Sequence, residues 1–252
     1  MATVAAQYTA AALSDRGRKR SSNEDAFGYS VEDGVYLVCD GMGGAAAGEV
    51  ASSLAIEEVL RIVAARRAEE KLPVSTLADD SVRSANQLIH ERSHRNPRLR
   101  GMGTTLVGIL AGDHEACIVH VGDSRCYRLR AGRIERCTQD HSLVEEEMRA
   151  GRMTASQAAR SPMRNVITRA LGTQSAVQPE IAALAVEPGD LFLLCSDGLS
   201  RELSDQRMES LLAEGLAAST PLEELCASLI QAANKAGGND NITCILVRAA
   251  GL

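Results

Sequence analysis

The chain contains no tryptophan, and aromatic side chains make up only 2% of its 252 residues. Proteins that hold single-stranded nucleic acid stack its bases on aromatic rings, so the composition argues against a surface of that kind. Apolar residues nevertheless amount to 45% of the chain. We therefore expect leucine, valine, isoleucine and alanine to fill the core of one large domain spanning residues 1–252.

An excess of basic residues and a long apolar run are also missing. The net charge is −6, so nothing draws the protein to DNA or to an anionic membrane. No apolar stretch approaches the roughly 18–20 residues needed to cross a bilayer. Residues 1–13 have neither the basic start nor the apolar centre of a signal peptide. We expect a cytoplasmic protein with no nucleic-acid partner and no membrane partner.

Cysteines at metal-binding or redox spacing are absent as well. The seven cysteines include no C-x-x-C pair, which argues against a zinc ribbon or a thioredoxin-like centre. Most of them lie in apolar runs, as do Cys39, Cys117, Cys195 and Cys244. A thiol in such a run behaves as a small buried hydrophobe. Reduced thiols of this kind fit a cytoplasmic location.

Short apolar runs bounded by turn residues predict several strands. These runs are residues 35–39, 104–110, 116–121, 126–130, 191–195 and 242–248. Residues 127–137 predict a hairpin that turns at Ala131 and Gly132. Neighbouring hairpins of this kind favour antiparallel sheets.

Longer stretches predict helices at residues 49–71 and 74–95, and apolar side chains of the first recur at helical spacing. A later helix has a capping threonine, a proline at the first position, a glutamate that completes a capping box and a terminating glycine: Thr220, Pro221, Glu223 and Gly237. The helix pair must cover a sheet. The order of elements therefore predicts a layered α+β domain.

Three aspartates stand at the ends of predicted strands. VYLVCDGMGG places Asp40 and Gly41 after one apolar run, and LFLLCSDGL places Asp197 after another. In GGNDN, Asp240 comes just before the strand at 242–248. Each site taken alone is most simply a turn, because Asp-Gly is a common turn dipeptide. Three such sites, each with glycine nearby, are harder to explain in that way.

Carboxylates that converge repel one another, so a cluster of them needs a cation. Hard oxygen ligands favour Mg²⁺ or Mn²⁺, whereas zinc would favour histidine or cysteine. Because Gly41 has no side chain, the backbone there can approach a bound ion closely, and the Gly41 carbonyl can itself coordinate the ion. Near the N-terminus, Arg20 precedes Glu24 and Asp25. A guanidinium grips phosphate through two nitrogens, although composition alone favours an ordinary surface arginine.

Seven short motifs follow one another along the chain. They are RSSNED at 20–25, DGMGGAAAGE at 40–49, GMGTT at 101–105, VGDSRCY at 121–127, QDHS at 139–142, CSDGL at 195–199 and GGNDNIT at 237–243. Each motif alone is weak, but their order and spacing are very specific. From about Ser14 to Arg248 the chain resembles the bacterial branch of the metal-dependent type 2C protein phosphatases.

The resemblance implies a four-layer α-β-β-α sandwich, in which two antiparallel sheets are flanked by helix pairs. It implies a protein serine/threonine phosphatase in which two Mn²⁺ or Mg²⁺ ions activate water against a phosphoester. No protein nucleophile is then needed. The implied partners are phosphoproteins and a cognate serine/threonine kinase, and we expect a monomer.

The resemblance also assigns the metal ligands. Asp40 would bridge the two catalytic ions, and Asp197 and Asp240 would complete the first site. The Gly41 carbonyl would help to hold the second ion. Waters would fill the remaining positions, as is usual for ions that keep part of their hydration.

Further roles follow from the N-terminal motif and from QDHS. Glu24 and Asp25 would support the second ion, largely through bound water, and Arg20 would bind the phosphate and offset charge in the transition state. Bacterial members often bind a third ion, for which Asp140 and Asp197 are the implied ligands. Asp123 is interpreted as structural, in a turn with its two neighbours.

Residues 141–166 match the family's mobile flap beside the cleft, which we expect to read the substrate. Two positions depart from relatives: many have histidine where this chain has Ala45, and eukaryotic relatives have histidine at Met42. The second histidine is thought to protonate the leaving group, so the general acid is unassigned here. Water is one candidate, and His141 is the rival because it is close in sequence to a predicted ligand.

Two alternatives stay open. The first is a pseudophosphatase, which uses the same fold as a binding module. Such proteins usually lose a metal aspartate, whereas Asp40, Asp197 and Asp240 are all present. The second is a serine phosphatase that acts on an anti-sigma-factor antagonist. Those proteins usually carry long sensor regions, which are not evident in this sequence.

Overall fold

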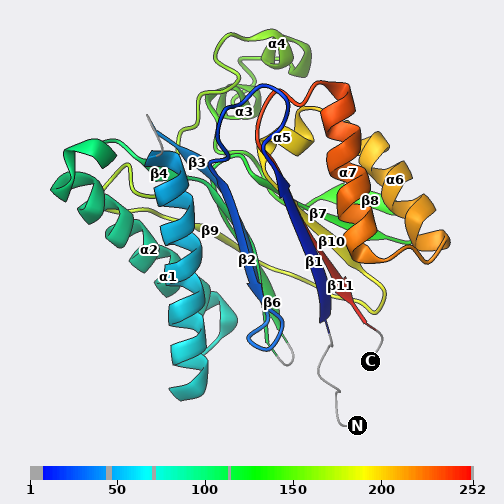
Figure 1. Ribbon diagram of the computed structural model, residues 1–252, viewed down its shortest axis with the longest axis horizontal. Helices are drawn as coiled ribbons and strands as arrows, with labels where there is room; N and C mark the ends of the chain where they lie inside the picture. The colour runs from blue at the N-terminus through cyan, green and yellow to red at the C-terminus, as the bar shows by residue number, and fades with distance from the viewer. Residues whose placement is uncertain (1–7, 44–46, 70–71, 113–114, 251–252) are drawn as a thin grey trace.

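The computed structural model describes residues 8–43, 47–69, 72–112 and 115–250. Two antiparallel sheets pack face to face, and helices cover both outer faces (Figure 1). The layers follow the order helix, sheet, sheet, helix. The predicted four-layer α-β-β-α fold is therefore confirmed.

The first sheet has the strand order β1–β11–β10–β7–β8. Its strands are β1 (Tyr8–Asp15), β7 (Arg125–Arg130), β8 (Arg133–Arg136), β10 (Leu191–Cys195) and β11 (Ile242–Ala249). Helices α6 (Asp205–Ala217) and α7 (Leu222–Ala236) cover its outer face. There Leu193, Leu246 and Leu229 belong to one buried apolar cluster.

The second sheet runs β2–β3–β5–β6–β9, with a short strand β4 beside β3. Its strands are β2 (Asp25–Ser30), β3 (Val35–Met42), β4 (Gly103–Thr104), β5 (Leu106–Ala111), β6 (Ala116–Val121) and β9 (Glu180–Ala183). Helices α1 (Ala47–Glu69) and α2 (Val74–Arg95) cover it, and a 3₁₀ turn at Pro97–Leu99 follows them. Tyr36, Phe192 and Ile245 lie in the buried cluster between the two sheets.

The predicted strands are present, but the run at 104–110 is divided. The backbone N–H of Thr105 donates to the Asp40 carbonyl at 2.9 Å, and its hydroxyl accepts from the Asp40 N–H at 3.0 Å. These bonds separate β4 from β5. Strands β1, β2 and β9 were not predicted; they are edge strands, and partial exposure leaves them without a continuous apolar run.

The hairpin from β7 to β8 turns at Ala131 and Gly132, as predicted. Their φ values of 50° and 75° match the turn that suits two-residue hairpins. The helices predicted at 49–71 and 74–95 are α1 and α2, although residues 70–71 lie outside the described part of the chain.

The capping box predicted for α7 was wrong. Pro221 has extended backbone angles and is itself the N-cap residue, and no side chain caps this helix end. Thr220 therefore lies one position too early to cap it, and Glu223 has no capping partner. The predicted end at Gly237 is confirmed.

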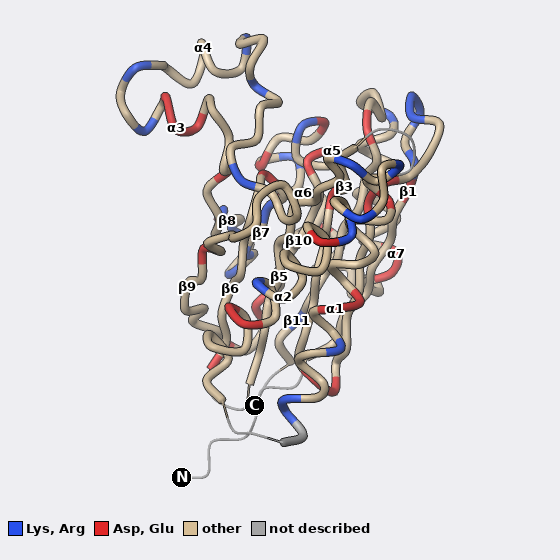
Figure 2. The backbone as a smooth tube through the Cα atoms, turned by 90° about the vertical axis from the view of Figure 1, so that its left-hand side faces the viewer, with Lys and Arg blue, Asp and Glu red and all other residues tan. Residues whose placement is uncertain are grey.

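Residues 141–166 form a lobe that projects beyond one end of the sandwich (Figure 2). It contains the short helices α3 (Leu143–Arg149) and α4 (Ala155–Arg160). Among the residues described above, no helix is long and apolar enough to span a membrane.

Candidate metal centre and active site

The two sheets bring aspartates together at the end of the sandwich that carries the lobe. Residues 35–39 of β3 are fully buried, and Asp40 follows them at the edge of the core. Asp25, at the start of β2, is its Cα partner in the strand register. Asp197 begins the short helix α5 (Asp197–Ser200) after β10, and Asp240 lies two residues before β11. The ends of four strands thus supply one cluster.

The carboxylates of this cluster act strongly on one another. Burial raises the pKa of Asp40 well above its usual value, and Asp25 and Asp197 raise it further. Burial likewise raises the pKa of Asp25 to about 6 and that of Asp197 to about 7. Asp123 and Asp240 add to the pKa increase at Asp197. Without a cation, the cluster therefore tends to hold protons near neutral pH.

Several carboxylate oxygens in the cluster have no hydrogen-bond partner among the residues that the structure describes. They are Oδ1 of Asp25, Oδ1 of Asp123 and Oδ1 of Asp197, all buried. The second oxygen of Asp25 accepts from the Ser196 hydroxyl at 2.7 Å, so that carboxylate is held in place. Buried unpartnered oxygens are costly unless something binds them. Hard divalent cations such as Mn²⁺ or Mg²⁺ fit this donor set.

The loop before β2 brings Arg20 to the same place. Its Nη2 donates to Oδ2 of Asp240 at 2.7 Å, and just over half of its side chain is exposed. The Asn241 side chain holds the loop, because it accepts from the Glu24 N–H at 2.9 Å and donates to the Ser22 carbonyl at 2.8 Å. The sequence analysis gave no role to Asn241. Its position next to Asp240, a predicted metal ligand, was the feature that could have indicated one.

Gly41 lies where β3, the N-terminal loop and α1 come closest. Its N–H donates to the Glu24 carbonyl at 3.1 Å. A Cβ atom at this position would overlap the carbonyl oxygens of Gly48 and Glu24, so the position requires glycine. Burial raises the pKa of Glu24. The structure thus brings Arg20, Glu24 and Gly41 to the border of the aspartate cluster.

Asp140 and Asp123 differ in how their oxygens are used. Both oxygens of Asp140 are held by Arg125, at 2.9 and 2.7 Å, and Arg136 adds a third bond of 3.0 Å. Asp123 instead shares Arg201 with Asp197: Nη2 of Arg201 lies 3.0 Å from Asp123 Oδ2 and 2.6 Å from Asp197 Oδ2.

Asp123 therefore faces the cluster and is not engaged in the turn that the sequence predicted. Its neighbour Ser124 hydrogen-bonds to Thr105 at 2.6 Å, and Arg125 binds Asp140. The sequence analysis did not identify Arg201 as part of the site. It follows Asp197 by four residues, about one helical turn, and this spacing could have indicated a contact between the two side chains.

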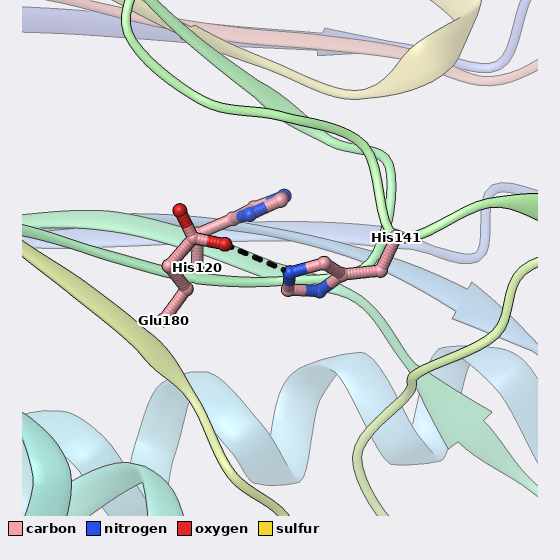
Figure 3. A group of neighbouring side chains, drawn as sticks. All are labelled: His120, His141 and Glu180. Carbon is pink, nitrogen blue, oxygen red and sulfur yellow. Dashed lines mark hydrogen bonds and ion pairs between the residues drawn. The ribbon is translucent and has the colours of Figure 1, made fainter. Parts of the chain in front are cut away.

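His141 lies at the base of the lobe, and its ring points toward Glu180 (Figure 3). Its Nδ1 accepts from the Gly122 N–H at 3.1 Å, so its proton is on Nε2, which faces Glu180 at 3.2 Å. His120 lies beside this pair. The polar atoms of these three side chains are close enough to suggest a metal site.

The hydrogen bond from Gly122 argues against a metal ion in that group. A metal at Nε2 of His141 would displace its proton while Nδ1 still lacks one, which would leave the ring as an anion. We therefore assign this group to fixing the base of the lobe. It is separate from the aspartate cluster.

A groove of about 880 Å³ runs from the aspartates to the lobe. Arg20, Asp123 and Asp240 line one part of it, and Val144 and Met148 of the lobe line another. The groove is thus polar at the cluster and partly apolar under the lobe.

Relatives have histidine at two positions where this chain has Met42 and Ala45. The structure describes the first of these positions. Met42 ends β3, where it pairs with Gly103 of β4. Ala45 lies outside the described residues.

Comparisons with known proteins agree with this geometry. The family profile described as Protein phosphatase 2C matches residues 15–247. The protein phosphatase PhpP of Streptococcus pneumoniae is 34% identical over 238 residues, which cover 93% of this chain and 95% of that protein.

Solved structures give the same result. The serine/threonine phosphatase PstP/Ppp of Mycobacterium tuberculosis superposes with a TM-score of 0.86 at 36% identity, covering 96% of this chain and 99% of that one. A structure of the PstP catalytic domain in complex with two manganese ions has a TM-score of 0.84 at 35% identity, with 96% and 98% covered.

Proposed function

Because the chain belongs to the protein phosphatase 2C family, we propose that it hydrolyses phosphoserine and phosphothreonine in proteins with water activated by two Mn²⁺ or Mg²⁺ ions. The observation that carries the proposal is the aspartate cluster, with its buried and unpartnered carboxylate oxygens. The related PstP domain with two manganese ions supports the choice of metal.

The protein residues have distinct roles in this proposal. Asp40 would hold both ions, Asp197 and Asp240 would complete the first site, and the Gly41 carbonyl would contribute to the second. When bound, the ions lower the pKa of a coordinated water and align it with phosphorus. Each of these positions borders the groove or the cluster that opens into it.

The N-terminal loop and β2 supply the rest of the site. Glu24 and Asp25 support the second metal, largely through water. Arg20 turns its guanidinium to the phosphate and offsets charge that develops in the transition state. The 2.7 Å contact between Arg20 and Asp240 supports this assignment, because it holds the guanidinium beside the proposed metal site.

A third ion fits Asp123 and Asp197 better than it fits Asp140 and Asp197. Asp123 and Asp197 each have a free buried oxygen and share the Arg201 guanidinium, which a cation can replace. Asp140 already has three bonds from arginines. We therefore transfer the third-metal proposal from Asp140 to Asp123.

The substrates are phosphoproteins, and the proposed partner is a serine/threonine kinase that phosphorylates them. The single catalytic domain of residues 1–252 would use the lobe at 141–166 to contact the substrate, since its side chains line the groove. The seven unpaired cysteines support a reducing, cytoplasmic location.

Hydrolysis of a phosphothreonine peptide tests the proposal directly. Exhaustive treatment with EDTA should abolish activity, and Mn²⁺ should restore it, with Mg²⁺ tested in parallel. A binding module without activity would release no phosphate from the peptide or from p-nitrophenyl phosphate under any metal. Activity that survives complete chelation would contradict the two-metal mechanism.

A further inference from the structure

Two cysteines lie opposite each other at the open end of the β7–β8 hairpin. The Cys137 N–H donates to the Cys126 carbonyl at 2.8 Å, which extends the pairing of Tyr127 with Arg136 by one step. The Cys126 N–H donates instead to the Thr138 hydroxyl at 3.1 Å, so a single backbone bond joins the two cysteines. Residues opposed across an antiparallel pair have Cα atoms about 4.5–5.5 Å apart, within the range that a disulfide requires. Both side chains contact the buried cluster between the sheets, so they leave the hairpin on the same face.

The two thiols differ in access to solvent. All seven cysteines lie in the described part of the chain, and Cys137 alone among them is not buried. Cys126 is fully buried. An oxidant in solution therefore reaches Cys137 first and finds Cys126 directly behind it.

The surroundings also favour reaction at Cys137. The adjacent Cys126 thiol lowers the pKa of Cys137, and the positive charge of Arg128 lowers it further. The closeness of the two thiols raises the pKa of Cys126, as does burial. An accessible thiol that ionises readily, with a second thiol beside it, is the arrangement of redox-sensing cysteines.

A second thiol pair in the chain provides a comparison. Cys226 lies close enough to Cys244 to raise the pKa of Cys244, but both are fully buried. Both pairs therefore bring two sulfur atoms close together, but only the pair of Cys126 and Cys137 includes a thiol that an oxidant in solution can reach.

We propose that Cys137 and Cys126 are an oxidation site at which a hydroperoxide forms a reversible disulfide across the β7–β8 hairpin. The Cys137 thiolate attacks the peroxide oxygen, which gives a sulfenic acid, and the other peroxide oxygen leaves as an alcohol after taking up a proton. The Cys126 sulfur then attacks the Cys137 sulfur, and hydroxide leaves with the Cys126 proton as water. In total, two thiols and one hydroperoxide give one disulfide, one alcohol and one water.

The position of the pair connects it to the groove. Arg125 directly precedes Cys126, Arg136 directly precedes Cys137, and both arginines hold Asp140 at the base of the lobe. A disulfide here ties together the two strand ends that carry these arginines. The inference goes beyond the phosphatase activity and does not depend on it.

Peptide mapping of the full-length, Mg²⁺-loaded protein tests the proposal. The protein is exposed to a small excess of tert-butyl hydroperoxide, alkylated in denaturant and digested with trypsin. Cleavage after arginine should yield residues 126–128 joined to residues 137–149, with the other cysteines alkylated. Dithiothreitol should release the two peptides.

Three variants sharpen this experiment. In Cys126→Ala, the sulfenic acid of Cys137 should accumulate and be trapped by dimedone. In Cys137→Ser, Cys126 should stay fully alkylated after peroxide treatment. The matched control Cys226→Ala, which disrupts the buried pair, should form the 126–137 disulfide as the native chain does.

The proposal is overturned if native Cys137 passes to sulfinic acid without a joined peptide. It is also overturned if peroxide oxidises another cysteine first, or if Cys137 links two molecules to each other. None of these readouts uses phosphatase activity, so a failure here is distinct from a failure of the proposed function.

Discussion

Asp25 lies opposite Asp40 on the neighbouring strand, with their Cα atoms paired in the β2–β3 register. Like charges directly opposite each other destabilise a sheet, and here other aspartates add to the repulsion. A cation bound between the two carboxylates would offset this repulsion. The pair therefore connects the strand register to the proposed metal chemistry.

Replacing Asp40 with asparagine removes the charge that both proposed metal sites share. We expect Asp40→Asn to lower kcat on a phosphothreonine peptide by at least ~10³, about 4 kcal/mol of barrier. The midpoint of thermal unfolding in Mg²⁺ should change little. Asp79→Asn, which breaks an exposed pair on α2, is the control and should keep native kcat. Near-native turnover in Asp40→Asn would mean that the site is misplaced.

Asp123 and Asp140 should respond differently to the same change. Asp123→Asn should remove the weakest Mn²⁺ equivalent in a calorimetric titration, because it removes an oxygen that faces Asp197. Asp140→Asn should leave the number of bound ions unchanged. It should instead lower the free energy of unfolding by roughly 3 kcal/mol, because two arginines lose their carboxylate. Loss of the third ion in Asp140→Asn alone would restore the original assignment.

His141 is not placed to protonate the leaving group, since both ring nitrogens are engaged away from the aspartates. We expect His141→Gln to leave the acid limb of the pH–rate profile on a phosphothreonine peptide unchanged. A native limb near pH 6–7 that vanishes in this variant would give the role to His141.

A histidine introduced at Met42 provides the complementary measurement. Turnover of p-nitrophenyl phosphate should be insensitive to Met42→His, because that leaving group needs little protonation. Turnover of the phosphothreonine peptide should rise, or its pH profile should bend near the imidazole pKa of ~6.5. If Met42→His changes the turnover of neither substrate, the hypothesis that a general acid is missing at position 42 is wrong.

The raised carboxyl pKa values predict how the metal-free protein responds to pH. The folded pKa values of Asp25 and Asp197, about 6 and about 7, lie above the usual value of 3.8. The folded state therefore holds protons that the unfolded state releases. In EDTA, the stability that these two carboxyls contribute below pH ~4 should be lost as pH rises to about 7, by on the order of a few kcal/mol. The lowered pKa of buried His120 changes the unfolding free energy in the opposite direction over part of this range.

Saturating Mg²⁺ is the control for this titration. A bound cation offsets the repulsion, so the decline in unfolding free energy should largely disappear. Chemical denaturation at a series of pH values measures both curves. Metal-free and Mg²⁺-loaded curves with the same slope between pH 4 and 7 would contradict the carboxylate cluster as described, because the contribution of His120 is common to both curves.

Much of the site follows from local sequence. Asp40 and Asp197 end apolar runs, and Asp240 comes shortly before one, so a run of apolar residues next to an acidic turn is enough to locate them. The central strands were predicted for the same reason. The edge strands β1, β2 and β9 were not, since partial exposure weakens the apolar pattern.

The layered α+β class, the strand-end aspartates and, through the order of the motifs, the family can all be read from the sequence. The partners of those side chains depend on how the chain folds in three dimensions. Arg125 binds Asp140 while Arg201 turns Asp123 toward Asp197, and residues 126 and 137 meet across a hairpin. Local propensity sets where a strand begins and ends. Which side chains meet depends on strand register and sheet packing, which involve residues far apart in the chain.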